Sequence, residues 1–197
     1  MCLVAFINRL GIEASSGYGV ANKIVAFVML VPSSLMQSMS SFVSQNVGAK
    51  NERRATKSML TGMAIGALIG IFVFLLIFFK GDFVSSIFTD NENVIRRSYE
   101  YLRGFAIEAV VTSVLFSFIG YFNGHGATML VMIQGLAQSF LVRLPMSYIM
   151  SVQPDASLSV IGLAAPTATV FGIVLNLVFF IFYQKKLNIK GNENKEN

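Results

Sequence analysis

The sequence predicts an all-α membrane protein, a bundle of five full transmembrane helices preceded by a truncated N-terminal helix. Hydrophobic residues make up 54% of the 197 residues, charged residues only 13%, and the mean hydropathy is +0.65. One soluble core cannot cover that much apolar surface. The apolar residues also fall into long runs separated by short charged loops, which is typical of helices that cross a bilayer.

The N-terminal residues 1–7 are apolar but too few to cross a membrane. Eight helical residues would cover only ~12 Å of a ~30 Å hydrocarbon core. The segment lacks the basic leading residues of a signal peptide, and Asn8 and Arg9 follow in place of a small-residue cleavage site. We therefore expect a helix whose first half is missing.

The first full span is expected over residues 19–47 and should be kinked or tilted. It is too long for one straight crossing, and Pro32 lies near its middle, with Ser33 and Ser34 available to satisfy the carbonyls that a proline leaves free. Gln37 shares one helical face with Ser40 and Ser44. Such polar side chains are expected to face the protein interior.

A short basic loop around Lys50 separates this span from the second, expected over residues 59–79. Gly62, Gly66 and Gly70 repeat every four residues along the second span. Their spacing exposes one stripe of backbone for close helix contact. We expect the stripe to pack against another helix of the same bundle; a seam between two copies is the alternative.

The third span is expected over residues 104–122 and contains Glu108, the only acid inside any apolar run of this sequence. Before it, the polar segment 80–103 is amphipathic and should rest at the membrane surface. Thr89 and Glu92 fit a capping box, so a helix should start there. It would enter the bilayer near Gly104.

The last two spans are expected over residues 128–150 and 160–183. The fourth contains Gln134, Gln138 and Arg143, and Pro145 should kink its last turns; the fifth contains Pro166 and Asn176. Residues 1–184 would form one transmembrane domain. The tail 185–197 is rich in Asn, Lys and Glu and is expected to be disordered.

Composition and motifs exclude several classes of function. The net charge of +5 comes from small clusters beside apolar spans, which favours membrane-flanking loops over nucleic-acid binding. A single cysteine excludes an intrachain disulfide and a cysteine metal cluster. No hydrolase, zinc-protease or phosphate-loop motif is present, so we expect no catalytic residues, no enzyme activity and no metal site.

Residues 45–55, Gln-Asn-Val-Gly-Ala-Lys-Asn-Glu-Arg-Arg-Ala, resemble a loop of the multidrug and toxic compound extrusion (MATE) transporters. The turn Gly120 to Thr128 and the segment Val142-Arg143-Leu144-Pro145 resemble two further motifs of that family. Two residues depart from the pattern: Ala127 replaces an acid, and His125 replaces a small residue. Both lie in a loop.

The resemblance implies the second lobe of such a transporter, from the end of its seventh helix to its twelfth. It also implies a cation-coupled antiporter, driven by sodium ions or protons, that exports lipophilic or cationic small molecules across the plasma membrane without a cofactor. The partners would be the bilayer, small-molecule drugs and a first lobe, without which the chain is expected to be inactive. The Lys50 loop, the His125 turn and the tail would be cytoplasmic.

Glu108 is the first candidate for cation coupling, because an ionised carboxylate inside a bilayer must be protonated, paired or hydrated. The resemblance adds Thr112, which occupies the family's usual acid position one turn later. The alternative is that Glu108 reaches the interface or pairs with Arg103. Cargo-path candidates are Gln37, Gln134, Gln138 and Asn176, and structural or gating candidates are Pro32, Arg143, Pro145 and Pro166.

Three alternatives accompany these predictions. Gln134 and Gln138 share a face and would either line the cargo path or tie two helices together. The second alternative is that the chain is a small non-transporting membrane protein that assembles through the Gly62, Gly66 and Gly70 stripe. The third alternative is a lipid-linked saccharide flippase of the same superfamily.

Overall fold

The computed structural model describes residues 12–152 and 158–196, which form long helices joined by short turns. The expected half-helix at residues 1–7 lies outside the described residues. The elements are α2 (Ile12–Gly48), α3 (Glu52–Ser86), α4 (Glu92–Phe105), α5 (Glu108–Gly124), α6 (Thr128–Ala137), the π-helix η1 (Gln138–Arg143), α7 (Leu144–Val152), α8 (Leu158–Gly162) and α9 (Ala164–Glu196).

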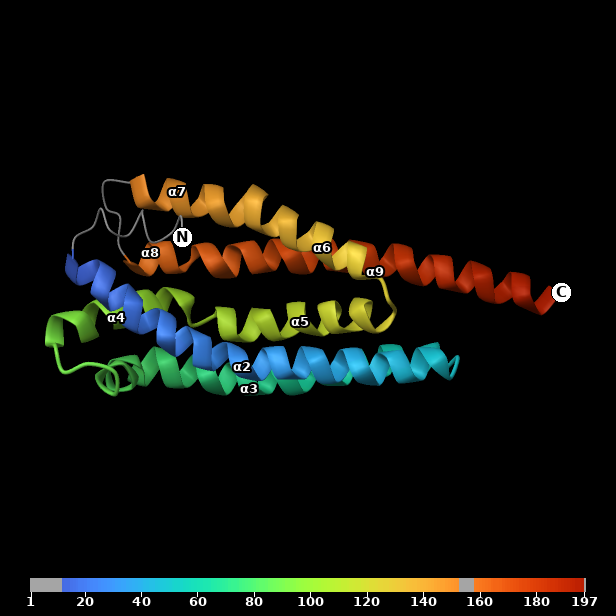
Figure 1. The fold of residues 1–197 in the computed structure, drawn as a ribbon, viewed down its shortest axis with the longest axis horizontal. Helices are drawn as coiled ribbons and strands as arrows, with labels where there is room; N and C mark the ends of the chain where they lie inside the picture. Colours follow the sequence, from blue (N-terminus) through green and yellow to red (C-terminus); the bar gives the residue numbers. More distant parts are fainter. Residues whose placement is uncertain (1–11, 153–157, 197) are drawn as a thin grey trace.

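The long helices run side by side along the long axis of the molecule (Figure 1). Helix α5 is central: it packs against α2 and α3 on one side and against α9 on the other, and η1 covers the far side of α9. Helices α2, α3, α6 to α7, and α8 to α9 are each long and apolar enough to cross a membrane, and α4 with α5 forms a fifth, bent span. The predicted all-α membrane bundle is thus confirmed.

Two turns meet at the end of the bundle where α2 passes into α3. Asn51 caps α3, its Oδ1 accepting a hydrogen bond from the Arg54 amide at 3.1 Å. From the turn after α5, the His125 Nε2 lies 2.8 Å from the Glu52 Oε2, while Nδ1 lies 2.9 Å from the Tyr121 carbonyl oxygen. His125, which the sequence analysis noted as a departure from the family pattern in a loop, thus connects one turn to the other.

The glycine stripe of α3 packs inside the bundle. A Cβ atom at Gly70 would lie 2.6 Å from the Ala109 carbonyl oxygen, and one at Gly66 would lie 2.9 Å from the Ser113 Cβ, both on α5. Only glycine lets the two backbones come this close. The contact within the bundle is confirmed, and the stripe is not free to serve as a seam between copies or as an assembly surface.

The third span differs from the expected straight helix. It consists of α4 and α5, which meet at a 47° bend around Ala106 and Ile107. The cap of α4 is also not the expected Thr89. Asn91 immediately precedes the helix, so its Oδ1 reaches the amides of Asn93 at 3.0 Å and Val94 at 3.3 Å.

Two of the prolines change the hydrogen bonding of their helices. Ser33 and Ser34 both donate to the Leu30 carbonyl oxygen, at 2.9 and 2.8 Å, and not to the carbonyl four residues before Pro32. Pro145 lies in the first turn of α7, directly after η1. Because its nitrogen cannot donate to the carbonyl four residues earlier, a π-helix at this point accommodates the missing bond.

Helix α9 shows both a permitted proline and an unexpected extension. Pro166 lies in its first turn, where a missing amide hydrogen is tolerated. The helix then continues to Glu196 and includes the tail that the composition predicted to be disordered. Extending an existing helix needs no new nucleation, so a polar tail can follow a transmembrane segment as further helical turns.

Candidate functional site

Glu108 is the first residue of α5 and follows directly on the bend. Its side chain is only 8% exposed. It lies ~24 Å along α5 from the turn at Gly124, which places it inside a ~30 Å hydrocarbon core. The bend matters here because it creates a helix N-terminus within the membrane, where the positive end of the helix dipole stabilises a carboxylate.

One hydrogen bond of good geometry holds this carboxyl group, and the Thr112 hydroxyl lies close beside it. The Thr169 hydroxyl of α9 donates to the Glu108 Oε1 at 2.7 Å, whereas Oε2 is buried and has no hydrogen-bond partner. Pairing with Arg103, the alternative from the sequence, is wrong. The Arg103 guanidinium instead lies over the rings of Phe78 and Tyr99, at 5.1 and 5.8 Å from their centroids.

Two glutamines extend the hydrogen bonds from Glu108 across to the fourth span. The Gln134 Nε2 donates to the Gln138 Oε1, and the Gln138 Nε2 donates to the Thr169 Oγ1 at 3.4 Å. Gly172 makes room for both side chains, since a Cβ atom there would lie 2.8 Å from the Gln134 Nε2. The chain of bonds thus ties α6 and η1 to α9 and α9 to α5.

Several buried polar atoms around these bonds have no partner. They are the Glu108 Oε2, the Thr112 Oγ1, the Gln134 Oε1 and both amide atoms of Asn176. Leaving such a group unpaired away from water costs ~1–3 kcal/mol. Four of the five atoms are oxygens, and hard cations such as Na⁺ are bound by oxygen ligands. The residues therefore fit a site that accepts either a proton or a small cation.

This polar cluster, defined as Glu108, Thr112, Gln134, Gln138 and Thr169, lies between two apolar clusters. On α5, Phe105 and Ala106 belong to one and Phe118 to the other. On α9, Ala165 and Ile173 similarly flank Thr169. Apolar packing at both ends keeps bulk water away, which strengthens any charge interaction inside.

Two candidates from the sequence lie elsewhere. Gln37 is exposed on α2, and no contact in the described residues joins it to the polar cluster. Arg143 is exposed at the end of η1 and forms no ion pair within 4.0 Å in the described parts of the chain, although its charge lies close enough to interact with Glu108. The Gln37 face is therefore not packed inside this lobe, and its role as a cargo-path candidate stays a prediction.

Thr169 and Gly172 are the functional candidates that sequence reasoning missed. Thr169 precedes Asn176 by seven residues, so the two share one helical face, and Gly172 lies between them on that face. A search along the face of Asn176 would have found both. In residues 12–152 and 158–196, no three His, Cys, Asp or Glu side chains gather as a metal site.

We expect Thr169→Val to destabilise the protein, because it would leave both carboxyl oxygens of Glu108 buried without a donor. The cost is about 1–3 kcal/mol, or a melting temperature several degrees lower for a chain of this size. Thr169→Ser keeps the hydroxyl and serves as the control. Equal melting temperatures for the valine and serine variants in detergent would contradict the assigned bond.

Comparison with known proteins places these features in a family. The family model described as MatE matches residues 1–149 of the chain. A probable multidrug resistance protein NorM of Bacillus cereus is 23% identical over 180 residues, which cover 89% of this chain and 38% of that protein. The probable multidrug resistance protein YoeA of Bacillus subtilis is 26% identical over 95 residues, 48% of this chain and 20% of that protein.

A solved structure shows the same fold. It is titled as an inward-facing conformation of a multidrug resistance MATE family transporter, and it matches with a TM-score of 0.68 at 15% identity. The match covers 90% of this chain and 39% of that one, so the chain spans about two fifths of the length of its longer-matching relatives. The family model matches three quarters of the chain, and the solved transporter structure has the same helical fold. This multi-pass membrane chain therefore belongs to the MatE family.

Proposed function

We propose that the chain is the second lobe of a multidrug efflux transporter, in which Glu108 couples export to the entry of a cation. The observation that carries the proposal is a carboxyl group inside the membrane with one oxygen bonded by Thr169 and the other free. Family membership and the multidrug relatives support a transporter of the plasma membrane over an enzyme. These comparisons do not favour a saccharide flippase.

The coupling cation is either a sodium ion or a proton, and it enters this mechanism as a substrate. Binding of either would neutralise the Glu108 carboxylate and remove its penalty in the low dielectric of the membrane. Thr112 is the second candidate ligand, since its hydroxyl is buried one turn away and unpartnered. The bound cation would thereby change the stability of the bend between α4 and α5.

The four cargo-path candidates divide by their positions. Gln134 and Gln138 bond to each other and to Thr169, which favours the role of tying helices together. Asn176 is fully buried with both amide atoms free and stays a candidate within the bundle. Gln37 is exposed, so it would contact cargo only at a surface of this lobe. Lipophilic and cationic small molecules are the proposed cargo.

Transport by this mechanism needs a first lobe. Alternating access requires two bundles that move against each other around a site at their interface. The relatives are more than twice as long as the matched segment, since this chain covers 38% of one of them. We propose that a preceding bundle, from the same or another polypeptide, supplies the opposite wall.

The test compares the chain alone with a two-lobe protein in which it is joined to the first lobe of the Bacillus cereus relative. We expect the two-lobe protein to export ethidium, a lipophilic cation, from vesicles under an imposed gradient, and the chain alone to export none. Separate sodium and pH gradients identify the coupling ion. Export by the chain alone, or none by a two-lobe protein that is folded in the membrane, would contradict the proposal.

A further inference from the structure

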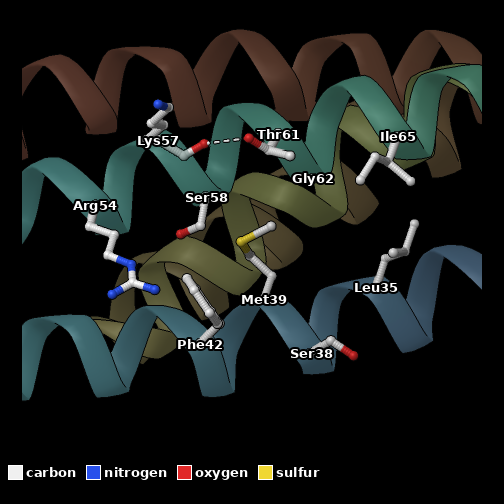
Figure 2. Close-up of a pocket in the computed structure, with 10 residues that line it drawn as sticks. All are labelled: Leu35, Ser38, Met39, Phe42, Arg54, Lys57, Ser58, Thr61, Gly62 and Ile65. Atoms are coloured by element: carbon white, nitrogen blue, oxygen red, sulfur yellow. Dashed lines mark hydrogen bonds between the residues drawn. The ribbon is translucent and has the colours of Figure 1, made fainter.

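A groove of about 450 Å³ runs between α2 and α3 on the outside of the bundle (Figure 2). It starts near the basic turn and follows both helices into the membrane-spanning region. Leu35, Met39 and Phe42 line it from α2, and Arg54, Ser58 and Ile65 line it from α3. The groove is remote from the polar cluster, because α5 separates its two helices from α9.

The positively charged side chain of Arg54 lies at the end of the groove nearest the turn. In Figure 2 the Arg54 side chain extends from α3 across the groove mouth toward Phe42, and its guanidinium carbon lies 5.6 Å from the centroid of that ring. The nearby acid Glu52 is bonded to His125 at 2.8 Å, and no acid in the described residues forms an ion pair with Arg54. The guanidinium is thus held in place with its donors free.

The other end of the groove is apolar. Leu35 and Ile65 face each other from α2 and α3, and Met39 covers Gly62 to form the floor (Figure 2). Ile65 lies ~16 Å further along α3 than Arg54, at the depth of lipid acyl chains. A polar, cationic mouth that leads into an apolar channel matches a molecule with an anionic head and a hydrocarbon chain.

We propose that this groove binds one anionic phospholipid, its phosphate at Arg54 and one acyl chain along Leu35, Met39 and Ile65. An Arg guanidinium forms bidentate hydrogen bonds with phosphate oxygens. The Ser58 hydroxyl donates to the Ala55 carbonyl oxygen at 2.7 Å, so Arg54 supplies the donors at this end of the groove. The cationic cargo proposed for the transporter does not fit, because Arg54 and Lys57 would repel it. A partner protein would need an acidic side chain at the position of Arg54, whereas every anionic phospholipid carries a negatively charged phosphate.

The chain contains no tryptophan, so a single one reports on the groove without background. We would place it by Ile65→Trp in the full chain, reconstituted in phosphatidylcholine vesicles that contain brominated phosphatidylglycerol or brominated phosphatidylcholine as a quencher. The control reporter is Phe72→Trp, on the same helix, 67% exposed and outside the groove. Neither measurement depends on transport, so the lipid site is tested independently of the proposed function.

We expect brominated phosphatidylglycerol to quench the tryptophan at position 65 at a several-fold lower mole fraction in the vesicle than brominated phosphatidylcholine does. The two brominated lipids should quench the tryptophan at position 72 at equal mole fractions. Arg54→Ala should reduce the preference about fivefold, which corresponds to the ~1 kcal/mol that one basic residue contributes near anionic lipid. Arg53→Ala removes the same charge one residue earlier, outside the groove, and should leave most of the preference intact.

Three results would overturn the lipid site. The first is equal quenching of position 65 by the two lipids. The second is the same loss of preference in Arg53→Ala and Arg54→Ala, which would indicate general attraction to the basic turn. The third is loss of quenching at position 65 in the two-lobe protein with position 72 unchanged, which would show that the first lobe covers the groove. Arg54→Lys keeps the charge, so a folded lysine variant with an intact preference would exclude a folding defect as the cause.

Discussion

Glu108→Gln should abolish cation-driven efflux in a two-lobe protein that contains this chain, while the protein still folds and reaches the membrane. Glutamine keeps the size of the side chain and can still accept the hydrogen bond from Thr169. A neutral amide, however, offers no charge to a cation in a low-dielectric site. We expect cation affinity to fall at least ~100-fold, equivalent to ~2.8 kcal/mol.

The efflux assay needs a carboxylate control outside the membrane. Glu92 is the exposed first residue of α4, so Glu92→Gln removes the same charge without touching the polar cluster. We expect its efflux to equal that of the unchanged protein. Undiminished gradient-driven efflux by the Glu108 variant would return this residue to a structural role at the bend.

Gly70→Val should destabilise the lobe strongly. A Cβ atom at this position would lie 2.6 Å from the Ala109 carbonyl oxygen and 2.8 Å from the Val110 Cα, so α3 and α5 would have to separate. Both atoms belong to backbone, which cannot move aside as a flexible side chain can. Overpacking of this kind costs ~3 kcal/mol or more, or a melting temperature lower by ~6–12 °C.

Gly135→Val is the matched control for that substitution. It introduces the same side chain into a membrane helix, but nothing lies within 4 Å of a Cβ atom at this position. We expect size-exclusion profiles and melting temperatures in detergent to separate the two variants clearly. A Gly70 variant as stable as the Gly135 variant would contradict the close packing of α3 on α5.

The spans could be predicted from the sequence because long apolar runs have few alternatives in a membrane. The bend before Glu108 could not. Ala106 and Ile107 are ordinary helix residues, and neither proline nor glycine stands at the break. Contacts from distant segments hold it: the Ser159 hydroxyl donates to the Glu100 carbonyl oxygen at 2.7 Å, and Thr169 binds Glu108. Such long-range partners are invisible in a local pattern.

The candidate site was predicted in part, for a similar reason. Glu108 stands out as a solitary acid, and hydrogen bonds through Thr169 connect it to Gln138 and Gln134. Asn176 is buried further along α9. Thr169 carries no such signal, because a threonine in a membrane helix commonly bonds its own backbone. Gln37 was grouped with these residues by polarity alone, and helix rotation places it on the outside.

The most direct test of the proposed role of Glu108 is whether Glu108→Gln removes cation binding from the purified two-lobe protein. Sodium binding is measured by calorimetry, and proton release by a pH indicator when ethidium is added. We predict that the unchanged protein and Glu92→Gln bind one of the two cations, whereas Glu108→Gln binds neither. Cation binding by Glu108→Gln with unchanged affinity and stoichiometry would show that Glu108 is not the coupling residue.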